Sequence, residues 1–159
     1  MKASKLLKFI PIAINGRKPI LLQGEPGVGK TDVIIQAVQS MGHTIHVRHA
    51  VCMEPIDFRG FPCINRESEI TVAEFVPYGD LLDMINATET TVYFYDDLGQ
   101  SSQSVQKAMM QLFHLREVNG RKISDFVVFI GATNRRTDRA GVNGLITPLI
   151  SRQKSIIKF

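Results

Sequence analysis

The sequence predicts an α/β protein in which helices cover both faces of a parallel five-stranded sheet. Three observations lead to this fold class. Short runs rich in β-branched and aromatic residues alternate with segments of helical period along the 159 residues. Two of these runs are apolar almost throughout, as in strands that are buried on both faces. The segments between the runs are long enough for the right-handed crossovers that join parallel strands.

The first part of the chain predicts two strands and the helix between them. Residues 1–17 form an N-terminal segment of helical character, and residues 19–23 form the first strand. A helix is expected from residue 31 until Gly42, which would stop it. Residues 44–51 have the composition of a second strand. The apolar face of the helix comprises Val33, Ile34, Ala37, Val38 and Met41.

A long excursion from the sheet is expected over residues 53–78. This segment is rich in proline, glycine and charge and lacks a helical period, so it predicts one short strand at most, over residues 69–76. A short helix over residues 80–87 should follow. The pattern leaves open whether Phe58 and Phe61 contact a substrate or pack against the sheet.

The second part of the chain predicts three more strands. Residues 91–97 form an apolar and aromatic run that ends in two acids, which is typical of a central strand. The pair Asn119-Gly120 indicates a β-hairpin, and residues 126–134 form a fourth buried strand. A last strand is expected over residues 154–159. Between the acids and the hairpin, a helix is indicated by the spacing of Val105, Ala108, Met109, Leu112 and Leu115.

The composition is that of a globular protein, and a cytoplasmic location is expected because membrane-span and signal-peptide patterns are not seen. Hydrophobic residues make up 44% of the chain and charged residues 21%, which excludes disordered and fibrous classes. No apolar run approaches the ~20 residues of a membrane span, and the N-terminus lacks a clear signal peptide. Cys52 and Cys63 fit no metal-binding or redox spacing. The net charge of +4 is scattered, so it permits a nucleic-acid partner without indicating one.

The stretch "GEPGVGKT" predicts a phosphate-binding loop. It matches GxxxxGK[ST], and it lies after a strand and at the start of a helix, where the mechanism requires it. Glycines allow backbone N–H groups to converge on phosphate oxygens, and the helix N-terminus adds further donors. Lys30 would reach the β and γ phosphates of ATP, and the Thr31 hydroxyl would bind Mg²⁺. The expected nucleotide-binding residues are Gly24, Glu25, Pro26, Gly27, Val28, Gly29, Lys30, Thr31 and Asp32.

Polar residues at the ends of two later strands could complete such a site. Asp96 is predicted to hold the metal and Asp97 to act as the base for an attacking water. Asn134 ends the fourth strand, where its amide could orient that water or contact the γ-phosphate. Taken singly, the acids could instead belong to a solvated strand end, although the apolar residues before them favour a buried strand, and Asn134 alone would more often be a turn residue. Their order after the loop favours the site.

Together, "GEPGVGKT", "VYFYDD", "GATNRR" and "PLISR" resemble the core of an AAA+ ATPase. The segments "EPIDFRGFP" and "REVNGRKI" are most similar to the MoxR-like branch. The resemblance implies that residues 1–159 are one nucleotide-binding core domain with the P-loop NTPase three-layer sandwich and sheet order 5-1-4-3-2. It further implies ring assembly, commonly of six subunits, and ATP hydrolysis that remodels a client protein, often one with a von Willebrand A domain.

The resemblance assigns roles by position. Lys30 and Thr31 fall on the Walker A residues, Asp96 and Asp97 on the Walker B pair, and Asn134 on sensor 1. Arg152 falls where the family places an arginine finger, which acts on the γ-phosphate of a neighbouring subunit. Three other arginines compete for that role or form an ion-pair cluster. They are Arg135, Arg136 and Arg139.

Two departures from the family pattern bear on activity. The family usually has glutamate where this chain has Asp97, whose carboxylate lies one methylene closer to its backbone. The helical lid that follows the core in the family is not part of this chain, which stops within an apolar strand at Phe159. The chain is therefore expected to be a piece of a longer protein.

The favoured function is Mg²⁺-dependent ATP hydrolysis by a ring subunit that acts on a protein. One alternative is a module that binds nucleotide and hydrolyses it negligibly. Another is a DNA-handling AAA+ protein that resembles clamp loaders or helicase loaders, and a small-metabolite kinase is weaker because its acceptor-binding signatures are not visible. The sequence identifies neither the client nor the ring size.

Overall fold

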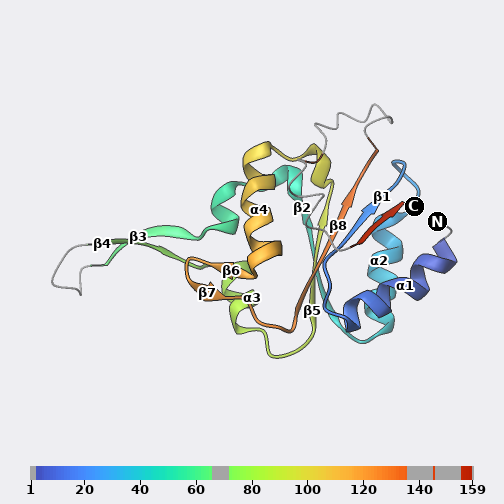
Figure 1. Ribbon diagram of the computed structural model, residues 1–159, viewed down its shortest axis with the longest axis horizontal. Helices are drawn as coiled ribbons and strands as arrows, with labels where there is room; N and C mark the ends of the chain where they lie inside the picture. Colours follow the sequence, from blue (N-terminus) through green and yellow to red (C-terminus); the bar gives the residue numbers. More distant parts are fainter. Residues whose placement is uncertain (1–2, 66–71, 136–144, 146–154, 159) are drawn as a thin grey trace.

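A parallel five-stranded sheet forms the centre of the molecule (Figure 1). The structure is a computed structural model that describes residues 3–65, 72–135, 145 and 155–158. The sheet order is β2-β5-β8-β1-β9. Numbered by position in the chain, the five strands run 5-1-4-3-2 from the β9 edge, so the predicted topology is confirmed. The strands are β1 (Ile20–Gln23), β2 (Thr44–His49), β5 (Thr91–Asp96), β8 (Val127–Thr133) and β9 (Ser155–Lys158).

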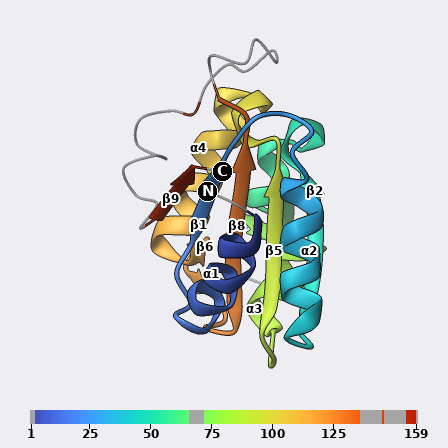
Figure 2. The same ribbon diagram turned by 90° about the vertical axis from the view of Figure 1, so that its right-hand side faces the viewer.

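Helices cover both faces of this sheet, which gives the predicted three layers (Figures 1 and 2). Every residue of β5 and β8 is buried. Successive side chains of a strand point to opposite faces, so Val92 and Phe94 of β5 pack in one layer and Tyr93 and Tyr95 in the other. One layer contains α1 (Ala3–Asn15) and α2 (Lys30–Ser40), and the other contains α3 (Asp80–Asn86) and α4 (Gln103–Leu115).

The N-terminal helix α1 belongs to the core of this chain. Leu6 and Ile10 are fully buried in the same apolar cluster as Ile34 and Val38 of α2. The docked face of α1 therefore covers α2 and the adjoining sheet.

The segment after β2 contains more structure than predicted. Strand β2 ends at His49, and two short 3₁₀ helices follow, η1 (Ala50–Cys52) and η2 (Pro55–Phe58). A projecting antiparallel hairpin then pairs β3 (Phe61–Asn65) with β4 (Val72–Val76) (Figure 1). The expectation of one short strand at most was wrong. Pro62 is tolerated in β3 because each strand of a two-stranded hairpin has an outer edge that needs no N–H partner.

The two phenylalanines of "DFRGFP" have different environments. Phe58 is buried, and its ring lies 5.8 Å from that of Tyr95 in β5, measured between centroids. Phe61 lies at the base of the hairpin and is 56% exposed. The question that the sequence left open is thus answered for Phe58, which packs against the sheet.

The remaining elements follow the sequence closely. The predicted hairpin at Asn119-Gly120 is confirmed as β6 (Glu117–Val118) and β7 (Arg121–Lys122). The 3₁₀ helix η3 (Leu98–Gln100) connects β5 to α4. Among the helices of the described ranges, none has the length and apolarity needed to cross a membrane. Cys52 and Cys63 are exposed free thiols.

The docking of α1 can be tested with two isoleucines of the same helix. Ile10 is fully buried, whereas Ile12 is 68% exposed. We expect Ile10→Ala to lower the free energy of unfolding by about 2–5 kcal/mol, because it removes packed methyl groups and leaves a cavity. Ile12→Ala is the control, with a change within about 0.5 kcal/mol. Urea denaturation measures both, and equal losses would contradict the docking of α1 on this core.

Candidate functional site

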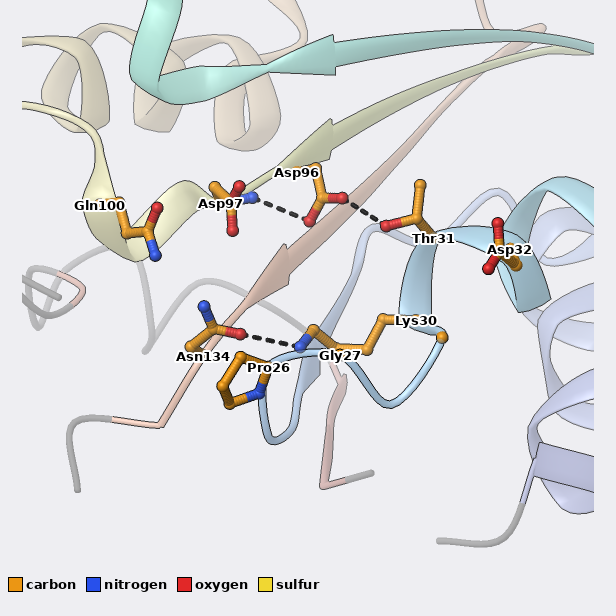
Figure 3. Close-up of a pocket in the computed structure, with 10 residues that line it drawn as sticks. Pro26, Gly27, Lys30, Thr31, Asp32, Asp96, Asp97, Gln100 and Asn134 are labelled. Carbon is orange, nitrogen blue, oxygen red and sulfur yellow. Dashed lines mark hydrogen bonds between the residues drawn. The ribbon is translucent and has the colours of Figure 1, made fainter. Parts of the chain in front are cut away.

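A cavity of about 480 Å³ opens where the carboxyl ends of β1, β5 and β8 meet. Its volume is in the range of small-molecule and cofactor sites. Residues from the β1–α2 loop, the start of α2, the β5–η3 turn and the end of β8 line it (Figure 3). They are Pro26, Gly27, Gly29, Lys30, Thr31, Asp32, Asp96, Asp97, Gln100 and Asn134.

The loop between β1 and α2 has the backbone that close approach to an anion needs. Gly27 and Gly29 adopt left-handed conformations, with φ of 74° and 79°, which a residue with a side chain would rarely take. Gly29 is the N-cap of α2 and has no side chain to satisfy the first N–H groups of the helix. The loop therefore presents backbone donors and the positive end of a helix dipole to the cavity.

Lys30 joins the loop to the end of β8. Its side chain is almost completely buried, with 7% of the residue exposed. The ammonium donates hydrogen bonds to the carbonyls of Gly24 and Glu25 at 3.2 and 2.7 Å and to Oδ1 of Asn134 at 2.8 Å. A lysine and an asparagine separated by 104 residues in the chain thus meet at one point, as their predicted roles require.

Thr31 and Asp96 meet on the opposite side of the cavity (Figure 3). The Thr31 hydroxyl donates to Oδ2 of Asp96 at 2.5 Å. The other carboxylate oxygen of Asp96 accepts from the backbone N–H of Asp97 at 2.9 Å. Hydroxyl and carboxylate oxygens are the hard donors that Mg²⁺ prefers, and it commonly takes one or two carboxylates and completes its shell with water and phosphate. This pair fits a magnesium ion, although the described residues hold no cluster of three histidine, cysteine or acidic side chains.

Asp97 begins the turn that leads from β5 to α4. Its backbone is left-handed, with φ of 55°, a conformation that aspartate accepts more readily than most residues. Burial raises the pKa of its carboxyl above the ordinary value, and the neighbouring charge of Asp96 raises it further. Asp96 and Asp97 line the same cavity as Lys30, so two carboxyl groups and an ammonium group lie around one space.

Of the arginines that were candidates for the contact with a neighbouring subunit, only Arg135 lies within the described residues. Arg135 follows Asn134, and its guanidinium lies 3.1 Å from the carboxylate of Glu25. Both side chains are largely exposed, so this ion pair contributes little to stability. Arg136, Arg139 and Arg152 lie outside the described residues, and their roles stay predictions.

Most of the predicted nucleotide-binding residues line the cavity, and three do not. Gly24 and Glu25 act through carbonyls that accept from Lys30, and Val28 is 40% exposed on the loop. Gln100 lines the cavity but was not predicted. No local pattern in the sequence marks it, because its place depends on the 3₁₀ turn after Asp97.

Several solved structures share the fold of this chain. A candidate ATPase from Cytophaga hutchinsonii superposes with a TM-score of 0.64 at 18% identity and covers 98% of this chain. The Thermotoga maritima RuvB Holliday junction branch migration motor gives 0.61 at 19% over 99%, and a point mutant of that RuvB gives 0.65 at 18% over 99%. The chain spans 45% of the first protein and 44% of each of the other two.

These likenesses establish a shared fold. At 18–19% identity they show the architecture that this chain shares with those structures and nothing finer. No protein-family model matches the chain. No curated protein sequence matches it either.

Replacing Asp97 with asparagine should stabilise the folded protein at neutral pH. The pKa of Asp97 is raised on folding, so folding favours its protonated form and opposes its ionised form. The resulting penalty is complete above the raised pKa and fades as the pH falls below it toward about pH 4, the ordinary value for aspartate. Asparagine carries no charge and also accepts the left-handed backbone.

Thermal unfolding of wild type and Asp97→Asn across this pH range, in buffer with a metal chelator, measures the effect. Glu89→Gln is the control, because Glu89 is exposed and remote from the cavity. If Asp97→Asn is less stable than the wild type at neutral pH, the ionised carboxylate does not destabilise the folded protein, and the prediction is wrong.

Proposed function

We propose that this chain is the nucleotide-binding core of an ATPase that binds ATP with Mg²⁺ and hydrolyses it. The observation that carries the proposal is the meeting of Lys30 and Asn134, on one side of the cavity, with Thr31, Asp96 and Asp97 on the other. These side chains come from the start of α2, the end of β5 and the end of β8. The cavity thus combines an anion-binding loop with oxygen donors for a cation.

The phosphate chain would lie along the loop and the start of α2. The backbone donors of the loop and the Lys30 ammonium would bind its β and γ oxygens. Lys30 would exchange its bonds to the Gly24 and Glu25 carbonyls for bonds to phosphate, and its bond to Asn134 would bring that amide next to the γ-phosphate. Asn134 would hold the γ-phosphate in line with an attacking water.

The acids would divide the remaining work. Thr31 and Asp96 would hold Mg²⁺, which when bound neutralises charge on the phosphate oxygens. The Asp97 carboxylate would accept the proton of the attacking water. Its raised pKa suits that role better than an ordinary aspartate would, because it brings the carboxyl closer to neutral pH.

The assembly and client are proposed from the sequence resemblance. We infer a homo-oligomeric ring of the MoxR-like branch, with six subunits as the usual number, that works in the cytoplasm. Its client would be a protein, in the MoxR-like case one with a von Willebrand A domain. Arg152 of a neighbouring subunit would contact the γ-phosphate, since a permanently charged planar fork offsets the charge of the transferring phosphoryl group.

Asp97 favours one alternative, a module that binds nucleotide but hydrolyses it negligibly. A carboxylate one methylene shorter than glutamate reaches less far from its backbone, so the attacking water could be held less well. The likeness to RuvB, a motor for Holliday junctions, favours a second alternative in which the partner is DNA. Binding of a DNA junction that weakens steeply with salt would support this second alternative over a protein client.

Phosphate release by the purified protein tests hydrolysis. We expect Lys30→Ala to lower the rate by about 10²-fold or more, because a buried donor to the phosphates is lost. Lys107→Ala is the matched control, because Lys107 is exposed on α4, outside the residues that line the cavity. Asp97→Asn should also lower the rate, although it stabilises the fold. Equal background rates in wild type, Lys30→Ala and Asp97→Asn would contradict enzymatic hydrolysis and favour the nucleotide-binding module.

A mixing experiment tests the proposed role of Arg152. Neither Arg152→Ala nor Lys30→Ala should hydrolyse ATP alone. Mixed rings should regain partial activity, because an intact Arg152 from a Lys30→Ala subunit can reach the intact cavity of an Arg152→Ala subunit. Co-assembly is checked by light scattering. If verified mixed rings stay inactive, Arg152 does not act in trans, and Arg135, Arg136 and Arg139 become the residues to substitute.

A further inference from the structure

Gln100 faces the cavity next to Asp97, although no motif includes it (Figure 3). We propose that Gln100 positions the attacking water together with Asp97. The inference rests on the proposed hydrolysis of ATP and names a further residue for that reaction. It follows from the geometry of one turn, from the contacts that hold the turn in place, and from the chemistry of a carboxamide.

The turn places Asp97 and Gln100 on the same side. The backbone N–H of Gln100 donates to the carbonyl of Asp97 at 2.9 Å, which is the bond between residues three apart that defines a 3₁₀ turn. The left-handed backbone of Asp97 starts the turn, and both side chains line the cavity.

Contacts with β8 hold the turn that contains Gln100 in place. The N–H of Gly99 donates to Oγ1 of Thr133 at 3.2 Å, one residue before Asn134. The side chain of Leu98 is fully buried and lies over Gly131, where an added Cβ would come within 2.3 Å of a Leu98 methyl carbon. These contacts fix the position of Gln100 relative to Asn134.

A second set of hydrogen bonds closes the turn on the α4 side. The hydroxyl of Ser101, which is fully buried, donates to the Leu98 carbonyl at 2.7 Å. The side-chain amide of Gln106 donates to the Ser101 carbonyl at 3.3 Å. Gln100 is therefore presented by a rigid support, which is the condition for a group that must hold a reacting water in line.

A carboxamide supplies what Asp97 lacks. An attacking water needs acceptors for its two hydrogens and an oxygen lone pair aimed at phosphorus. The Asp97 carboxylate would accept one hydrogen, and the Gln100 carbonyl oxygen would accept the other. Glutamine performs this task in other phosphoryl-transfer enzymes, where it orients the water without removing its proton.

The reaction step is balanced without any further reactant. The water oxygen forms a bond to the γ-phosphorus, and the bond from that phosphorus to the bridging oxygen of the β-phosphate breaks. The electron pair of the broken bond leaves with ADP. One proton of the water passes to the Asp97 carboxylate and later to solvent, while Gln100 is unchanged.

Two substitutions of Gln100 separate chemistry from packing. Gln100→Ala removes the side chain, and Gln100→Leu keeps a similar volume without polar atoms. We expect both to lower kcat by about 10²-fold. The Kd for ADP, measured by calorimetry, and the Tm should change little, because the phosphates and the fold are held by other residues. Gln103→Ala is the matched control, since Gln103 is exposed at the start of α4.

Each other result would overturn the inference. A wild-type kcat in either variant would show that the carboxamide is not needed, and a Leu variant that keeps activity while the Ala variant loses it would assign a packing role. A Kd that weakens in step with kcat would assign nucleotide binding. If the wild-type protein releases no phosphate while ADP still binds, the proposed hydrolysis fails and Gln100 loses its role with it.

Discussion

A buried ammonium group holds the two sides of the candidate site in register. Lys30 is nearly inaccessible to water, and a cation in that position is costly unless acceptors surround it. Two carbonyls of its own loop and the amide of Asn134 supply them, so the charge joins β1, α2 and β8. A phosphate chain offers stronger acceptors for the same ammonium. The group that organises the site is therefore also the group that would respond to a nucleotide.

Much of the fold could be predicted because it depends on local patterns. The continuous apolar run of β5 requires burial on both faces, and a parallel sheet between two helical layers provides it. The loop motif then fixes where the cavity must lie. Strand β4 of the projecting hairpin lies within the short strand predicted over residues 69–76, but its partner β3 could not be predicted. Gly60 and Pro62 read as a loop, and the exposed apolar side chains of β3 show no alternation with polar ones.

The residues of the candidate site also divide into those that a local motif predicts and those that depend on the folded structure. Lys30, Thr31 and Asp96 were predictable because a fixed spacing encodes a fixed chemistry. The distance between Lys30 and Asn134 depends on the pairing of β1 with β8, which no local spacing contains. Gln100 was missed for a related reason. Its place in the cavity depends on a left-handed residue and a 3₁₀ turn, and neither leaves a hydrophobic period in the sequence.

The same turn gives a physical reason for Asp97. Aspartate and asparagine accept a left-handed backbone more readily than glutamate does, because a short polar side chain can satisfy local hydrogen bonds there. Glutamate at this position would reach further into the cavity but would fit this turn less well. With aspartate at position 97 the turn is kept, but the carboxylate extends less far into the cavity. That turn brings Gln100 to the same side, so a second polar group lines the cavity beside Asp97.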